Sequence, residues 1–234
     1  VDTYPTQADY NYAFTDFIGQ SGYTLLWQED ADTLAVNDQT SLEILSESHP
    51  GIKQIRLAGE HMRKNAWLAV ETVHQLFPEH DTDKLIQLVS TFPGTNRRFE
   101  KLSENIYSDY AHHPTEISAT IQAALELNNN VVIIYQPHQN VRQHEIMSEG
   151  GYKNAFVGTK HVYWLPTYLS REREDLTILP PNTLIDSTTN KTNISESLMN
   201  RALADEIHRH QQNGDLVLAM SAGDLDGWLR SQLK

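Results

Sequence analysis

The feature that most constrains the fold is the run VVIIYQ at residues 131–136, which is continuously apolar and rich in β-branched side chains. Such a run is typical of a strand that is buried on both faces of a parallel sheet. Three more strand patterns share the second half of the chain with it, at 105–111, 161–165 and 215–220. Helical patterns separate them, so the sequence predicts a doubly wound, mostly parallel α/β sheet with right-handed crossovers.

The helix that precedes this strand has Pro114 at its first position and Glu116 at its third, residue types that suit a helix start. Apolar spacing predicts three further helices in this half, at 141–156, 194–212 and 224–233, and a strand at 97–102. Asn193 and Glu196 are placed like a capping box for the second of these helices.

The first third of the chain has its own helix and strand patterns. They predict a helix at 7–20 closed by Gly19, an apolar run at 24–28, a strand at 52–57, a helix at 59–77 stopped by Pro78, and a helix at 81–92 capped by Asp81. The pattern changes after FPGTN, so we place a domain boundary near residue 93. The fold class is therefore α/β, with domains at 1–93 and 94–234.

Composition narrows the classes of function. The net charge of −13 disfavours binding to a nucleic-acid backbone, which needs basic patches. No apolar run approaches the roughly 20 residues of a membrane helix, and no secretory signal is visible, so we expect no membrane insertion. Cysteine is absent, which rules out disulfides and thiol nucleophiles and fits a cytoplasmic location. The glycosylation sequons at Asn190 and Asn193 are therefore interpreted as chance matches.

Polar segments of unusual composition follow the predicted strands of the second half. They are DYAHH, QPHQNVRQ, PTYLSRE and SAGD. The carboxyl ends of parallel strands meet at one edge of a sheet, where ligands of such folds collect. The sequence therefore predicts a site at that edge.

The segment SDYAHHPTE at 108–116 admits two interpretations. Asp109, His112 and His138 could form a metal site and make the chain a metal-dependent hydrolase, since a catalytic site needs about three protein ligands. Adjacent histidines diverge, so at most one of His112 and His113 would bind a given ion. In the alternative, His113 caps the helix and His112 is a buried, hydrogen-bonded residue.

Four segments in order along the chain closely resemble motifs of the Mur ligases, the ATP-dependent amino-acid ligases of peptidoglycan synthesis. GEHMRKNAWLA resembles the G-x-H-N-x-x-N-A-x-x-A segment of that family. RRFE, then DYAHHPTE with QPH at the next strand end, and finally MSAGD resemble motifs of its carboxy-terminal domain. AHHPTE is most similar to members that join L-alanine to UDP-N-acetylmuramate, although a murein tripeptide ligase of the same family also carries A-H-H-P.

The resemblance implies an ATP-dependent reaction. Phosphate passes from ATP to the lactyl carboxylate of UDP-N-acetylmuramate, and the amino group of L-alanine attacks the acyl phosphate. Family members have three domains, and neither a G-x-x-x-x-G-K-[ST] phosphate loop nor the acidic magnesium-binding segment occurs here. We therefore expect a fragment that begins, at Val1, just beyond that segment. It would comprise the end of the central ATPase domain and the whole amino-acid-binding domain, with the main Mg²⁺ ligands in the missing part, and it would be inactive alone.

By the same resemblance, three residues bind the nucleotide: Asn65 the adenine, Arg98 the phosphates, and Asp109 the nucleotide from the carboxy-terminal domain. A fixed, always-charged guanidinium suits phosphate. The amino-acid pocket is implied to consist of Tyr110, His112, His138 and Arg142. Within this pocket Arg142 would hold the carboxylate of alanine and His112 would assist proton removal. Arg98 and His112 are thus the implied catalytic residues, and we expect no metal ligand in this chain.

The chain also departs from the family pattern. QPHQNVRQ replaces Q-P-H-R-Y-x-R-T, so Gln139, Asn140 and Gln143 stand where an arginine, a tyrosine and a threonine are usual. WLPTYLSRE replaces D-x-Y-x-A-x-E, which leaves Arg171 and Glu172 as candidates only. A different amino-acid substrate therefore stays open. So does a third class of function, a Mur-like binding module without catalysis.

Overall fold

The computed structural model describes residues 3–36 and 41–233, so the expected starting point Val1 lies outside the described residues. The chain divides into two compact units. Unit 1 is the chain up to Leu57 together with His61–Phe92, and unit 2 is Ala58–Glu60 together with the chain from Pro93. Assigning unit 1 to an ATPase domain stays a prediction.

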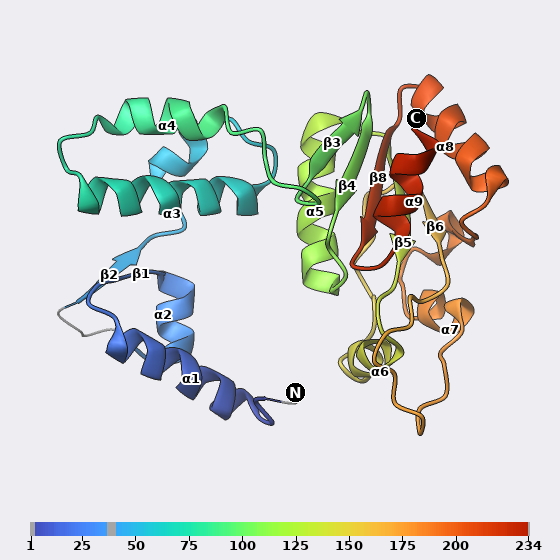
Figure 1. Cartoon of the computed structure of the whole chain (residues 1–234), viewed down its shortest axis with the longest axis horizontal. Coiled ribbons are helices and arrows are strands. Elements are labelled where there is room, and N and C mark those ends of the chain that lie inside the picture. The colour runs from blue at the N-terminus through green and yellow to red at the C-terminus, as the bar shows by residue number, and fades with distance from the viewer. Residues whose placement is uncertain (1–2, 37–40, 234) are drawn as a thin grey trace. The chain divides into compact units, whose positions relative to one another are not determined.

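Unit 1 combines short strands and helices. Its elements are α1 (Gln7–Gln20), β1 (Thr24–Trp27), α2 (Gln28–Leu34), β2 (Leu42–Leu45), the 3₁₀ helix η1 (Pro50–Gln54), α3 (Glu60–Leu76) and α4 (Thr82–Ser90) (Figure 1). β1 and β2 form a parallel pair. As predicted, the carboxylate of Asp81 caps α4, accepting hydrogen bonds from the backbone N–H groups of Asp83 and Lys84 at 2.9 and 3.2 Å.

Two predictions in unit 1 are wrong. Residues 52–57 are not a strand, because Pro50 begins η1 and the side chain of His49 caps it by accepting a hydrogen bond from Gly51. Ile52 and Ile55 are both buried, and a spacing of three matches one 3₁₀ turn rather than the alternation of a strand. Gly19 does not close α1, which runs to Gln20 with Ser21 as its C-cap.

Unit 2 contains a six-stranded sheet in the order β3-β4-β8-β5-β6-β7. The strands are β3 (Glu100–Ser103), β4 (Ile106–Asp109), β5 (Val131–Gln136), β6 (His161–Trp164), β7 (Ile194–Glu196) and β8 (Leu216–Ser221). Only the edge pair β3–β4 is antiparallel, and the other neighbours are parallel. The predicted mostly parallel α/β sheet is therefore confirmed, and β5 and β8 are buried throughout.

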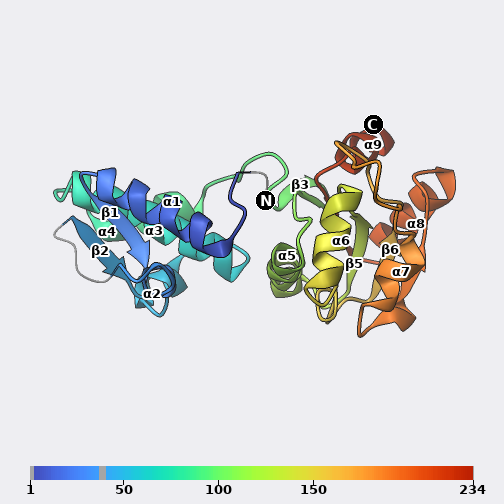
Figure 2. The same cartoon turned by 90° about the horizontal axis from the view of Figure 1, so that it is seen from below.

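Helices cover both faces of this sheet (Figure 2). One face packs against α5 (Pro114–Leu127), α6 (Asn140–Ser148) and α7 (Pro181–Asp186), through a core that includes Ile133, Tyr135 and Trp164. The other face packs against α8 (Arg201–Gln212) and α9 (Leu225–Gln232). The sheet is doubly wound, so the ends of β4, β5, β6 and β8 lie at one carboxyl edge.

Three predicted boundaries in unit 2 are wrong. β3 starts at Glu100 rather than 97, because Arg97 and Phe99 have φ values of 57° and 48° and form a turn. The helix predicted at 141–156 ends at Ser148, where Gly150 and Gly151 take φ values of 106° and 70°.

The helix predicted at 194–212 is also too long. Residues 194–196 form β7 and pair with β6, so Asn193 and Glu196 do not make a capping box. The cap is Asn200, whose side chain accepts a hydrogen bond from the backbone N–H of Leu203 at 3.1 Å. Edge pairing in the sheet has overridden the local capping pattern.

Candidate functional site

Four loops meet at the carboxyl edge of the sheet, and a series of ring contacts joins three of them. The Tyr110 and His112 rings, which follow β4, have centroids 5.6 Å apart. His112 lies 5.8 Å from His138, which follows β5. His138 in turn stacks on Tyr168, which follows β6, at 5.8 Å and an interplanar angle of 9°. Residues up to 58 positions apart in the sequence therefore share one surface.

Backbone contacts hold these loops together. Gln139 donates its N–H to the carbonyl of Tyr168, and Tyr168 donates to the carbonyl of Pro137, both at 2.8 Å. Gly223, in the loop after β8, packs so closely that a Cβ there would lie 2.7 Å from Cγ of Tyr168. A glycine is therefore required sterically where the fourth loop reaches the other three.

Asp109 organises the loop after β4. It is 5% exposed, and its two oxygens accept backbone hydrogen bonds from Phe99 and Ala111, each at 2.7 Å. The carboxylate thus ties β4 to the turn that carries the arginine pair. Its predicted contact with the nucleotide stays a prediction. Over residues 3–36 and 41–233, no group of three or more His, Asp or Glu side chains is arranged to hold a metal ion.

The adjacent residues His112 and His113 have different structural roles. His113 caps α5, as one interpretation of the sequence expected, because its Nδ1 accepts a hydrogen bond from the N–H of Thr115 at 3.4 Å. The Nδ1 of His112 lies 3.1 Å from the carbonyl oxygen of Tyr110 and 3.3 Å from Glu116. Both neighbours are acceptors, so Nδ1 carries the proton of the neutral ring and Nε2 keeps a lone pair. That nitrogen has the form a general base needs.

His138 favours the neutral state. Partial burial lowers the pKa of His138, and the neighbouring His112 lowers it further. A neutral imidazole here accepts or donates a hydrogen bond without adding positive charge to the surface.

The two arginines of the turn before β3 differ in their partners. The Arg97 guanidinium stacks on Tyr110 at 4.7 Å and donates to the carbonyl oxygens of Ser221 and Gly223. Arg98 is exposed and lies 5.5 Å from the centroid of the same ring. No carboxylate of the described ranges pairs with Arg98, so its fork of donors is available to an anion. Sequence reasoning missed Arg97, whose adjacency to Arg98 was the only signal.

Arg142 lies in the first turn of α6, close to His138 in the sequence. Its Nη1 contacts the carboxylate of Glu145 at 2.6 Å, and the two side chains are 48% and 33% exposed. Such an exposed pair contributes at most about 1 kcal/mol, so it does not prevent Arg142 from binding another carboxylate.

The departures from the family pattern have structural roles. Asn140 is 1% exposed and bonds the backbone of Thr177 and Leu179, while Gln143 is fully buried. Gln139 is the N-cap of α6, with φ 57° and no side-chain cap bond. Glu172 accepts hydrogen bonds from the N–H of Asn140, at the start of α6, and from the N–H of Ser170 in its own loop. The last candidates are exposed: Arg171, and Asn65 on α3 of unit 1.

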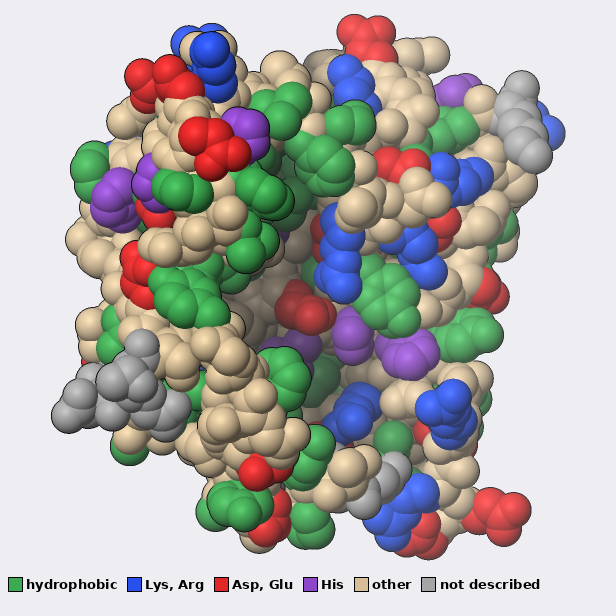
Figure 3. Space-filling model, turned by 60° about the vertical axis from the view of Figure 1, so that its left-hand side comes forward, with side chains coloured by type: hydrophobic (Ala, Val, Ile, Leu, Met, Phe, Trp, Pro, Cys, Tyr) green, Lys and Arg blue, Asp and Glu red, His purple; other side chains and the backbone are tan. Residues whose placement is uncertain are grey.

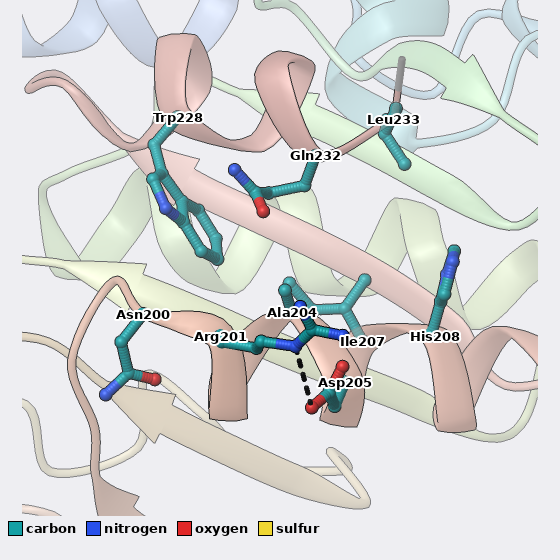
Figure 4. A pocket seen from close by; sticks show the side chains of 9 residues that line it. All are labelled: Asn200, Arg201, Ala204, Asp205, Ile207, His208, Trp228, Gln232 and Leu233. Atoms are coloured by element: carbon teal, nitrogen blue, oxygen red, sulfur yellow. Dashed lines mark ion pairs between the residues drawn. The ribbon is translucent and has the colours of Figure 1, made fainter.

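Charged side chains and pockets extend beyond this edge. Histidine, Lys and Arg side chains reach the surface of the chain in several places (Figure 3). A pocket of about 460 Å³ lies between α8 and α9, lined among others by Arg201, Asp205 and Trp228 (Figure 4). None of the predicted site residues lines it, so a cavity alone does not locate the site.

No helix in the described part of the chain is both long and apolar enough to cross a membrane.

Comparison with known proteins finds similar sequences and a similar solved structure. No profile of a known protein family matches the sequence. The chain is 30% identical over 152 residues to the UDP-N-acetylmuramate–L-alanine ligase of Clostridium tetani, covering 62% of this chain and 32% of that protein. It is 29% identical over 222 residues to the enzyme of the same name from Mycolicibacterium smegmatis, covering 90% of this chain and 44% of that protein. The chain thus spans less than half the length of these relatives.

A solved structure shares the fold. The UDP-N-acetylmuramate-alanine ligase of Thermotoga maritima superposes with a TM-score of 0.62 at 19% identity, over 98% of this chain and 55% of that one. This likeness shows the fold. The curated relatives and the ordered motifs both make the chain similar to the Mur ligases.

Proposed function

We propose that this chain is the carboxy-terminal part of an ATP-dependent ligase that forms an amide between the carboxylate of UDP-N-acetylmuramate and the amino group of L-alanine. The observation that carries the proposal is the series of contacts from Arg98 through Tyr110, His112 and His138 to Tyr168. It brings an anion-binding group and a base to one surface. Amide formation from an acyl phosphate needs both.

Each residue has a defined part in the proposal. ATP with Mg²⁺ supplies the phosphoryl group that activates the sugar carboxylate. Arg98, which no carboxylate of the described residues neutralises, would hold phosphate oxygens, and Asn65 would bind the adenine. Nε2 of His112 would take the proton from the attacking amine. The phosphate loop and the principal Mg²⁺ ligands are assigned to the part of the relatives outside the match, so we expect no ATP hydrolysis by this chain alone.

Arg142 is proposed to bind the carboxylate of alanine. Its contact with Glu145 is exposed and weak enough to be exchanged. A bidentate pair with a carboxylate would fix the orientation of a small substrate, leaving its amino group toward the histidines. Asn140 and Gln143 are committed to the fold, so they do not replace the positive charge absent at position 139.

The test measures binding of L-alanine to the whole chain by NMR, from shifts of the His112 and His138 resonances. Arg142→Ala should weaken the affinity by about tenfold or more, since a hydrogen bond to a charged group contributes about 1.5–3 kcal/mol. In a ligase with all the domains that the proposal requires, the same change should raise KM for the amino acid and leave nucleotide binding nearly intact.

Glu145→Ala is the matched control. It removes the competing carboxylate and leaves Arg142 in place, so affinity should stay equal or rise. If both variants bind L-alanine like the parent chain, Arg142 is not the carboxylate ligand. If the parent chain shows no shifts with L-alanine and clear shifts with another amino acid, the substrate assignment is wrong.

A further inference from the structure

We infer that three fully buried residues, Tyr135, Tyr152 and Gln143, are positioning residues that fix the backbones of His112 and His138 relative to one another. None of them is exposed to solvent. Tyr135 lies on β5, Tyr152 in the loop after α6, and Gln143 on α6. α6 covers the same face of the sheet as α5 (Figure 2). This inference concerns how the site is held, and its link to alanine binding rests on the proposed function.

The three side chains form one hydrogen-bonded series between the two histidines. The hydroxyl of Tyr135 lies 3.1 Å from the carbonyl oxygen of His112 and 2.9 Å from the hydroxyl of Tyr152. Tyr152 is 2.6 Å from Oε1 of Gln143, whose Nε2 donates to the carbonyl oxygen of His138 at 3.0 Å. Both ends of the series are therefore backbone atoms of candidate site residues.

The tyrosine hydroxyls supply fewer protons than the series has oxygen–oxygen contacts. The carbonyl of His138 is an acceptor only, which fixes the orientation of the Gln143 amide. Both tyrosines stay protonated, because burial raises the pKa of Tyr135 and of Tyr152. The two hydroxyl protons then serve three oxygen–oxygen contacts: Tyr135 with His112, Tyr135 with Tyr152, and Tyr152 with Gln143. Three contacts therefore share two protons. While Tyr152 donates to Gln143, the Tyr135 proton is shared between the His112 carbonyl and the Tyr152 oxygen, so the strength of the bond to His112 depends on Tyr152.

This dependence gives the network a signature that packing alone would not produce. When Tyr152 loses its hydroxyl, Tyr135 donates fully to His112. When Tyr135 loses its hydroxyl, His112 loses that donor and Tyr152 still bonds Gln143. Because a stronger hydrogen bond moves a carbonyl ¹³C resonance downfield, two similar substitutions should move the His112 carbonyl in opposite directions.

The experiment records backbone carbonyl ¹³C shifts of the whole chain without ligand. Tyr152→Phe should move the His112 carbonyl downfield, and Tyr135→Phe should move it upfield. Gln143→Met, which nearly conserves volume, should move the His138 carbonyl upfield. Tyr163→Phe is the control, because its hydroxyl contacts Glu206 and His210 instead, and both histidine carbonyls should then stay in place. Shifts of the same sign in both tyrosine variants, or none, would overturn the inference.

A second measurement separates this inference from the proposed function. If L-alanine binds the parent, Gln143→Met should weaken it by about tenfold, corresponding to the loss of roughly one hydrogen bond, and Tyr163→Phe should not. Opposite carbonyl shifts without alanine binding would support the positioning role and contradict the substrate. Alanine binding that is equally tight in Gln143→Met and the parent would contradict the positioning role.

Discussion

The two ends of the six-stranded sheet carry similar residue types in different states. At the amino edge, the buried carboxylate of Asp215 accepts two hydrogen bonds from Lys160 at 2.8 Å and one from His210 at 2.7 Å. Tyr163 contacts Glu206 and His210 beside them. At the carboxyl edge the buried carboxylate of Asp109 accepts hydrogen bonds from backbone N–H groups, and Arg98 stays available on the surface.

The comparison shows what distinguishes a site from a polar cluster. Both edges contain aspartate, histidine, tyrosine and a basic side chain, so residue content does not separate them. At the amino edge the side chains pair with one another and stabilise the fold. At the carboxyl edge Asp109 and Gln143 bind backbone groups, which leaves exposed side chains to meet a ligand on a fixed support.

The largest expected effect tests that support. Asp109→Ala removes the acceptor of two backbone N–H groups, those of Phe99 and Ala111, and each buried unsatisfied donor costs about 1–3 kcal/mol. The free energy of unfolding of unit 2, measured in urea, should therefore fall by about 3 kcal/mol. Asp205→Ala, at a side chain that is 69% exposed, should change stability by under about 0.5 kcal/mol. Equal stabilities for the two variants would show that the loop does not depend on Asp109.

The arginine pair gives the next effect. Arg97→Ala removes the charged donor to the carbonyls of Ser221 and Gly223, and should cost about 2 kcal/mol. Arg98→Ala should stay within about 0.5 kcal/mol of the parent, because the side chain is exposed. The proposed function predicts the opposite order for nucleotide affinity: Arg98→Ala should reduce it more than Arg97→Ala does. If Arg98→Ala destabilised the chain as much as Arg97→Ala, the division between supporting and available residues would be wrong.

Much of this edge could be predicted from sequence, because it depends on strand order. The run at 131–136 and the helix starting at Pro114 are strong local signals, and the structure contains both as β5 and α5. Parallel pairing then brings the ends of β4, β5, β6 and β8 to one edge without further information. The ring contacts of His112 and His138 follow from that topology.

The rest could not be predicted because it depends on partners far away in the sequence. β7 forms where Ile194 meets Val162, which no local pattern reveals, and the capping pattern at Asn193 pointed to a helix instead. Arg97 reaches residues 124 and 126 positions away. Gln143 could be noted only as a departure from a family pattern. Elements of four to seven residues, such as α2 and β2, are too short for a clear period.

Gly223 tests how closely the loops are packed. A Cβ at this position would lie 2.6 Å from Oε1 of Gln136 and 2.7 Å from Tyr168, so Gly223→Ala should cost about 1–3 kcal/mol through overpacking. Gly227→Ala is the control, since a Cβ there meets nothing within 4 Å and α9 should gain about 0.5–1 kcal/mol. Urea unfolding of both variants measures the difference. If Gly223→Ala gained stability as Gly227→Ala is expected to, the loop after β8 would not be packed against Tyr168 in the loop after β6.

The smallest effect compares the pH dependence of the two edges. Burial lowers the pKa of His138 at the carboxyl edge and of His161 at the amino edge below 6.5. Although burial opposes it, hydrogen bonds from Lys160 and His210 lower the pKa of Asp215 below 3.8. In each case the unfolded chain binds the proton more tightly, so stability is complete above the ordinary pKa and is lost as pH falls through the folded one.

Between pH 7 and 5, one histidine at each edge therefore contributes to the loss of stability. Below pH 4, Asp215 at the amino edge contributes as well. His138→Gln and His161→Gln should each make the decline in unfolding free energy from pH 7 to 5 shallower, by under about 1 kcal/mol because both rings are partly exposed. Asp215→Asn should lower stability at pH 7 and remove the part of the decline below pH 4 that comes from this carboxylate. Urea unfolding from pH 3 to 7.5 measures all three. A decline below pH 4 that is unchanged in Asp215→Asn would show that the amino-edge cluster does not stabilise the fold through its buried carboxylate.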